Sequence, residues 1–137
     1  MKKIGDYTWA VALCVVLIAA VYAAAQSDAP RISIRELKDL MDKGTPVTII
    51  DVQPVDIYAA GHIKGAISLP ASKKITLEDV WSIPSDRLIV TYCDCGPGEA
   101  DSADAAAQLF MFGYDVKVLG DPSIRGWKEA GYPMEKK

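Results

Sequence analysis

Polar and apolar residues follow a pattern that predicts alternating strands and helices. Aliphatic and β-branched residues fill the runs 47–52, 87–92 and 116–119, which is typical of buried strands. Apolar residues recur every three or four positions across 34–43 and across 102–112, the spacing of amphipathic helices. Strands and helices that alternate in this way predict an α/β domain with a mostly parallel sheet.

Shorter elements complete this prediction. We expect brief helices at 54–58, 76–84 and 124–130 and a short strand at 66–69. Ser33 and Glu36 form a capping-box sequence, in which each side chain can accept a backbone N–H of the other, so the first helix should begin directly after Ser33. Trp81 and Trp127 fall on apolar faces of short helices, and we expect both indoles in the core.

The N-terminal residues have the pattern of a targeting segment. Lys2 and Lys3 precede an uncharged apolar run, Trp9–Ala25, which ends on small residues. The run is shorter than the roughly 20 residues of a comfortable membrane-spanning helix. We expect residues 1–25 to be a cleaved secretory signal, with an uncleaved membrane anchor through residues 4–25 as the alternative.

The remaining chain is long enough for one small domain with its own core. The predicted organisation is a signal peptide or anchor at 1–25, a linker at 26–31 and a folded domain at 32–137. We expect the protein to be exported, either periplasmic or membrane-anchored and facing the periplasm. The chain has 15 Lys and Arg against 18 Asp and Glu, a net charge of −3. This acidic balance, with no basic stripe, argues against a nucleic-acid partner.

The main candidate for chemistry is Cys93, which follows the apolar run 87–92 and precedes a Gly/Pro turn and a helix start. Such a turn and the helix N-terminus can direct backbone N–H groups at one centre, which favours a thiolate and an anion beside it. The candidate cradle for the sulfur consists of Asp94, Cys95, Gly96, Gly98, Glu99 and Ala100. The alternative is a buried structural cysteine, because free cysteine packs as a small hydrophobe.

Cys95 leaves two interpretations open: a resolving thiol that attacks a modified Cys93, or a small buried side chain. The two cysteines are too close in sequence to join distant parts of a fold, so in an oxidising compartment we expect them to serve chemistry. A structural zinc needs four good ligands, and we expect no metal. Glu99 and Asp101 can complement the dipole of the helix that follows, with Asp101 or Ser102 as its N-cap.

Two further motifs resemble a known family. Asp51-Val-Gln-Pro-Val-Asp-Ile-Tyr58, followed by Gly61-His-Ile-Lys-Gly-Ala-Ile67, is similar to the signature of the rhodanese family. Ile124-Arg-Gly-Trp-Lys-Glu-Ala-Gly-Tyr-Pro133 is similar to the closing motif of that family, and the resemblance runs from about Ile32 to Met134. It implies a three-layer fold with a five-stranded, mostly parallel sheet flanked by helices.

The resemblance also implies an activity. A sulfurtransferase of this family carries sulfane sulfur as a persulfide on its loop cysteine, here Cys93. Its partners would be a small sulfur-containing donor and a thiol or cyanide acceptor, with no cofactor. Asp51 and His62 would be scaffold positions, with His62 a hydrogen-bonding residue in preference to a catalytic base.

The loop departs from the family pattern in its charge. Rhodanese loops carry arginine or lysine, whereas this one has Asp94, Glu99 and Asp101, and Gln53 replaces an arginine after Asp51-Val52. We expect the three carboxylates to disfavour the thiolate and to repel an anionic donor such as thiosulfate. A sulfurtransferase therefore remains the leading prediction, beside a thiol redox or sulfur-carrier protein that uses Cys93 and Cys95, and a non-catalytic binding module.

Overall fold

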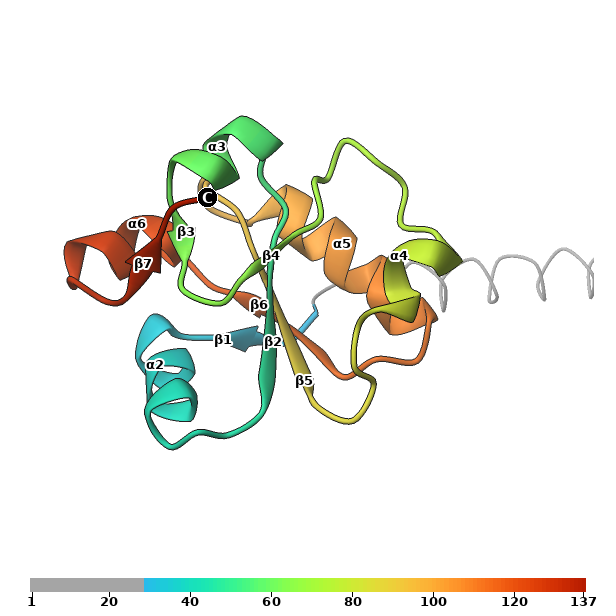
Figure 1. Ribbon diagram of the computed structural model, residues 1–137, viewed down its shortest axis with the longest axis horizontal. Helices are drawn as coiled ribbons and strands as arrows, with labels where there is room; N and C mark the ends of the chain where they lie inside the picture. The colour runs from blue at the N-terminus through green and yellow to red at the C-terminus, as the bar shows by residue number, and fades with distance from the viewer. Residues whose placement is uncertain (1–28) are drawn as a thin grey trace, which may run out of the picture.

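The computed structural model describes residues 29–137, so the predicted targeting segment lies outside the described residues. Five parallel strands form the central sheet in the order β1-β6-β5-β2-β4 (Figure 1). They are β1 (Arg31–Ile32), β2 (Val47–Asp51), β4 (Ile67–Ser68), β5 (Leu88–Tyr92) and β6 (Val116–Leu119). A separate antiparallel pair joins β3 (His62–Ile63) to β7 (Met134–Glu135). The predicted α/β fold is confirmed.

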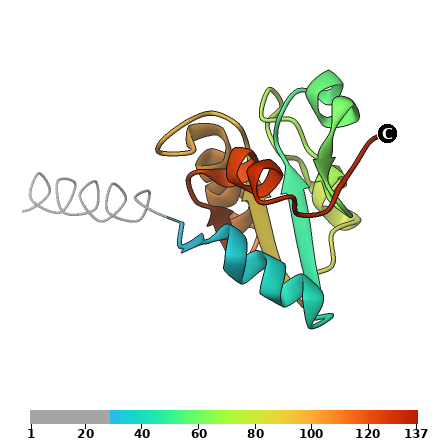
Figure 2. The ribbon, with the colours of Figure 1, turned by 90° about the vertical axis from the view of Figure 1, so that its left-hand side faces the viewer.

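Helices cover both faces of the sheet. One face carries α2 (Ile34–Asp42) and α6 (Ser123–Glu129), which lie in front of the strands in Figure 2. The other carries α4 (Leu77–Trp81) and α5 (Ala100–Met111). Leu37 and Trp127 pack in the first core and Val80 and Leu109 in the second. A further helix, α3 (Val55–Ala60), lies above the end of β2 (Figure 1). No helix within residues 29–137 has the length and hydrophobicity to cross a bilayer.

Most predicted elements are present with small shifts at their ends. The capping box of Ser33 and Glu36 is confirmed, since each side chain binds the backbone N–H of the other. Helix α5 begins two residues earlier than predicted. The two-residue strands β1, β3 and β7 were not predicted, because so short a segment has no readable periodicity. Arg31 in β1 belongs to the sheet although the sequence placed it in the linker.

The prediction for Trp81 is wrong, whereas that for Trp127 is confirmed. Trp127 is fully buried, but Trp81 is 84% exposed. Helix α4 is so short that it buries only Val80, and the next residue along a helix points about 100° away from its neighbour. Burial of Val80 therefore turns the Trp81 indole into solvent.

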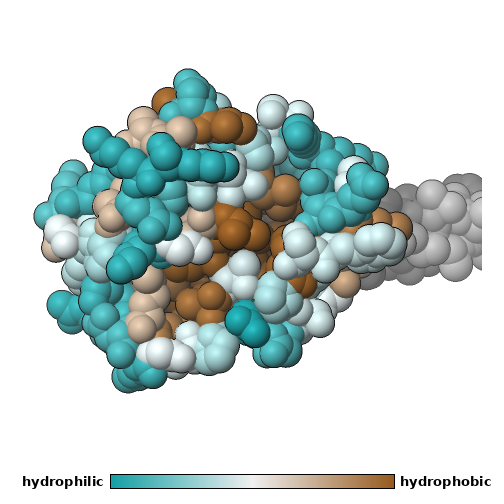
Figure 3. Space-filling view, viewed as in Figure 1, coloured by the Kyte–Doolittle hydropathy of each residue, from teal (hydrophilic) through white to brown (hydrophobic). Residues whose placement is uncertain are grey.

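The sheet topology sets the place of the site. Asp51 at the end of β2 pairs with Tyr92 at the end of β5, so the segments that follow these strands begin side by side. In parallel sheets, ligands bind beyond the carboxyl ends of the strands. Strand β4 pairs only with Ile50 and Asp51, which leaves the start of β2 at an open edge. Apolar surface gathers over this edge in the middle of Figure 3.

Candidate functional site

Cys93 directly follows β5 and is only 3% exposed. Its Sγ lies 3.5 Å from Ser102 Oγ, on the first turn of α5. Its carbonyl oxygen accepts a hydrogen bond of 2.9 Å from Ser123 Oγ, on the first residue of α6. Three elements thus fix one cysteine at the carboxyl end of the sheet.

The loop from Cys93 to α5 turns sharply through left-handed backbone conformations. Gly96 and Gly98 have φ angles of +78° and +91°, which glycine adopts without steric cost. Glu99 has φ of +43°, a conformation that a residue with a side chain keeps only where its surroundings hold it. The contacts of Glu99 therefore decide the shape of the loop.

Glu99 is the N-cap residue of α5, so the prediction of Asp101 or Ser102 at that position is wrong. Its side chain is buried, and each carboxylate oxygen has a donor outside the loop. Oε1 accepts from the Asp121 backbone N–H at 2.7 Å, and Oε2 accepts from Arg31 Nε at 3.0 Å. Glu99 thus ties the loop to β1 and to the segment between β6 and α6.

Asp94 is also neutralised from outside the loop. Its Oδ1 lies 3.1 Å from Arg125 Nε on α6, and the same guanidinium lies 3.2 Å from Asp121 Oδ1. Of the three carboxylates expected to repel an anion, two are therefore ion-paired to arginines, and the remaining one, Asp101, is an exposed residue of α5.

Cys93 and Cys95 are joined by a disulfide, with their Cα atoms 5.4 Å apart. Cys95 is exposed, whereas Cys93 is buried. An incoming thiolate therefore meets Cys95 first, and its attack there releases Cys93 as the leaving group. In this state Cys93 is not a free nucleophile, and reduction of the disulfide must precede any chemistry on it.

A second polar cluster lies beneath α3. Asp51 is fully buried, and its carboxylate accepts hydrogen bonds from the Gln53 N–H at 2.8 Å, from Gln53 Nε2 at 3.1 Å and from the Tyr92 hydroxyl at 2.6 Å. The Tyr92 oxygen in turn accepts from the Ile63 N–H at 3.0 Å. Burial, and then the hydrogen bond to Asp51, raise the pKa of Tyr92 far above its usual value.

His62 belongs to the same scaffold. Its ring stacks on Tyr58 with centroids 3.8 Å apart, Nδ1 lies 2.8 Å from the Tyr58 carbonyl oxygen, and Nε2 lies 3.2 Å from Glu135 Oε1. Both ring nitrogens are thus engaged by partners outside the Cys93 loop. Glu135 also accepts from the Gly65 N–H; this bond first, and then the one from His62, lower the pKa of Glu135. Within residues 29–137, no group of three acidic, His or Cys side chains is arranged to hold a metal.

Comparison with known proteins identifies the family. The profile of the rhodanese-like domain matches residues 33–130. The chain belongs to the rhodanese-like family. It is 32% identical over 111 residues to a protein of Mycobacterium tuberculosis named probable adenylyltransferase/sulfurtransferase MoeZ, a match that covers 81% of this chain and 28% of that protein.

The chain is also similar to a second curated protein and to a solved structure. The HTH-type transcriptional regulator Rv0324 of Mycobacterium tuberculosis is 36% identical over 89 residues, which cover 65% of this chain and 38% of the regulator. The chain therefore spans well under half of these curated relatives. The structure of the BH2092 protein from Bacillus halodurans superposes with a TM-score of 0.70 at 27% identity, over 86% of this chain and 85% of that one.

This rhodanese-like domain brings two arginines to its loop that sequence reasoning missed. Arg31 comes from β1 and Arg125 from α6. Arg125 lies within the closing motif, which follows β6. Because β6 and β5 are parallel neighbours, the sequence could have placed Arg125 near the residues that follow β5. Nothing in the sequence marks Arg31, which lies in a segment without helical or strand periodicity.

Proposed function

We propose that this chain is an exported sulfurtransferase that carries sulfane sulfur as a persulfide on Cys93. The observation that carries the proposal is a buried cysteine at the end of β5, held between Ser102 and Ser123 in a rhodanese-like domain. The name of its relative MoeZ, a probable sulfurtransferase, supports the same class of reaction.

The proposed reaction begins once a dithiol has reduced the disulfide with Cys95. The Cys93 thiolate attacks the outer sulfur of a donor, a new S–S bond forms, and the donor leaves with the electron pair of the bond that breaks. Thiosulfate would leave as sulfite, and an alkyl persulfide as a thiolate. The Cys93 persulfide then loses its outer sulfur to an acceptor thiolate or cyanide, which restores the Cys93 thiolate.

The disulfide favours a second candidate function, in which Cys95 is a resolving thiol. The Cys95 thiolate attacks Sγ of the Cys93 persulfide, the Cys93–Cys95 disulfide forms, and hydrosulfide leaves. The sulfane sulfur is thereby reduced while two thiols are oxidised, and a dithiol resets the pair. The Cys93–Cys95 disulfide of the structure supports this candidate, because the step would form the same bond.

Intact-mass spectrometry of the reduced protein distinguishes these functions. After incubation with thiosulfate or with polysulfide, a sulfurtransferase should gain the mass of one sulfur atom, in wild type and in Cys95→Ser but not in Cys93→Ser. If Cys95 resolves the persulfide, only Cys95→Ser keeps the adduct, and wild type returns to the disulfide mass with release of sulfide. A binding module would show no adduct with either donor.

Export is a separate part of the proposal and rests on the sequence of residues 1–25. N-terminal sequencing of the full chain expressed in a bacterial host should give Gln26 as the first residue of a periplasmic form. Met1 in the membrane fraction would support the uncleaved anchor instead. A cytosolic protein that begins at Met1 would contradict both versions, and it would leave the sulfur chemistry untouched.

A further inference from the structure

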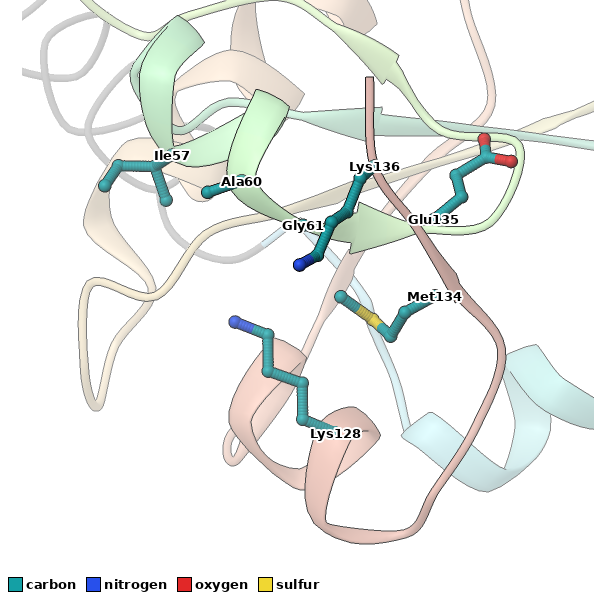
Figure 4. A pocket seen from close by; sticks show the side chains of 7 residues that line it. All are labelled: Ile57, Ala60, Gly61, Lys128, Met134, Glu135 and Lys136. Atoms are coloured by element: carbon teal, nitrogen blue, oxygen red, sulfur yellow. The ribbon is translucent and has the colours of Figure 1, made fainter.

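A cavity of about 530 Å³ lies between α3, α6 and β7, and neither cysteine of the Cys93–Cys95 disulfide lines it. Ile57 and Ala60 line it from α3, and Met134 lines it from β7 (Figure 4). Its volume falls within the range of small-molecule sites, about 300–1,000 Å³. Nothing in the chemistry of Cys93 uses this space.

The walls of the cavity are mostly apolar, and its charged lining residues are Lys128, Lys136 and Glu135. Lys128 on α6 and Lys136 after β7 extend their amino groups into the same opening, with the Met134 side chain beside them (Figure 4). Within the described part of the chain, neither lysine forms an ion pair. The carboxylate of Glu135 is engaged elsewhere, by the Gly65 N–H at 2.8 Å and by His62 Nε2 at 3.2 Å.

The elements around the cavity are fixed by backbone hydrogen bonds. Strand β7 pairs with β3 through Ile63 and Met134, and the Lys64 N–H donates to the Pro133 carbonyl at 3.1 Å. Beyond β7, the Lys137 N–H donates to the Ala59 carbonyl at 3.2 Å. The segment that carries Lys136 is therefore attached at both ends, and the cavity is preformed.

We propose that this cavity binds a small organic anion that has an apolar body. Two ammonium groups that face one opening repel each other, and an anion between them relieves that repulsion. The apolar body would lie against Ile57 and Met134, which removes exposed hydrocarbon from water. Neither interaction alone selects such a ligand, because an inorganic anion lacks the apolar contact and a neutral compound lacks the charge.

Helix α6 contributes to both the cavity and the sulfur site. Helix α6 begins at Ser123, which binds the Cys93 carbonyl, and Lys128 follows five residues later. At 1.5 Å per residue this is roughly 7.5 Å along the helix axis. The binding proposal is nevertheless independent of sulfur transfer, and its test contains no sulfur compound.

The test uses 4-phenylbutyrate as the probe and 4-phenylbutyramide as its neutral counterpart. Methyl NMR spectra of the full chain should show saturable shifts of the Met134 ε-methyl and the Ile57 δ-methyl with the carboxylate. The exposed Met111 ε-methyl on α5 serves as the internal control and should not shift. We expect the carboxylate to bind about tenfold more tightly than the amide, the order of magnitude for one to two solvent-exposed charge pairs.

Two sets of variants complete the experiment. Lys128→Gln combined with Lys136→Gln should remove the preference for the carboxylate, whereas Lys73→Gln combined with Lys74→Gln, an exposed lysine pair elsewhere, should keep it. All four lysines are exposed, so the fold is retained. Equal affinity for acid and amide, equal shifts at Met111 and Met134, or no saturable shift would each overturn the proposal.

Discussion

Two buried carboxylates at the same end of the sheet are held in different ways. Asp51 is bound by neutral donors, namely the Gln53 amide groups and the Tyr92 hydroxyl. Glu99 is bound by a charged donor, Arg31, and by the Asp121 N–H. The Asp51 cluster joins strands inside the fold, whereas the Arg31 side chain at the Glu99 contact is 38% exposed.

The difference indicates that Asp51 holds the fold together, whereas Glu99 controls the conformation of the loop. Removal of Asp51 leaves buried donors without partners in the middle of the domain, so its effect should fall on folding. Removal of the Glu99 charge frees a loop whose backbone is held in a left-handed conformation. Its effect should fall on the placement of Cys93 more than on overall stability. Variants of the two clusters can test this separation.

Asp51→Ala should have the largest effect. It leaves the Tyr92 hydroxyl and the Gln53 amide without their acceptor, and a buried unsatisfied group costs about 1–3 kcal/mol. We expect a loss of about 3 kcal/mol in the free energy of unfolding, measured by urea denaturation. Asp56→Ala, an exposed carboxylate on α3, is the matched control and should change stability by less than about 0.5 kcal/mol. Equal losses in both variants would remove the special role of Asp51.

Tyr92→Phe should cost about 2 kcal/mol at neutral pH, because Asp51 loses a donor and the Ile63 N–H loses its acceptor. It also changes the pH dependence. The folded-state pKa of Tyr92 is raised, so its contribution to stability is complete below the unfolded value of about 10 and is lost as the pH rises above it.

Urea titrations between pH 8 and pH 11 measure this effect. Wild-type stability should fall more steeply above about pH 10 than that of Tyr92→Phe, by up to about 1.4 kcal/mol per pH unit. Tyr132→Phe is the control, because that hydroxyl has no hydrogen bond within the described residues. Parallel curves for wild type and Tyr92→Phe would mean that Tyr92 ionises in the folded protein.

Glu99→Gln keeps the size of the side chain and removes its charge. We expect about 1 kcal/mol less stability, because the ion pair is partly exposed, together with about tenfold slower persulfide formation on Cys93. Stopped-flow mixing of the reduced protein with a persulfide donor measures that rate. Asp101→Asn, an exposed carboxylate close by, should leave the rate unchanged.

A double-mutant cycle tests whether Glu99 acts through Arg31. If the two residues act as one contact, Arg31→Gln should slow persulfide formation as Glu99→Gln does, and the double variant should be no slower than either. Additive losses would show that Glu99 acts through another partner.

The sequence predicted the elements that have a clear period and the position of Cys93 after a strand. It also predicted the capping box at Ser33, because that motif is a local pattern. It could not predict that Glu99 binds Arg31, a contact across 68 positions. The loop was therefore expected to repel anions, although arginines from outside it neutralise Asp94 and Glu99. Trp81 was misplaced because apolar character alone does not say which side of a short helix is covered.

Arg125 gives the smallest expected effect and the sharpest test of the charge at the loop. It pairs with Asp94 and Asp121 while half of its side chain is exposed. Arg125→Gln should leave stability nearly unchanged, because exposed pairs contribute about 0–1 kcal/mol.

Arg125→Gln should raise the KM for thiosulfate about two- to fivefold at low salt, because two carboxylates then face the anionic donor unneutralised. In about 0.5 M salt the difference should vanish, since screening acts within a few ångströms. The KM for cyanide, which enters as a smaller and partly protonated acceptor, should change less.

Steady-state kinetics of wild type and Arg125→Gln across a salt series measure both constants. Arg87→Gln, at the opposite end of β5, is the control. A KM for thiosulfate that does not respond to Arg125→Gln at any salt concentration would mean that the donor approaches Cys93 from the side of Arg31 instead.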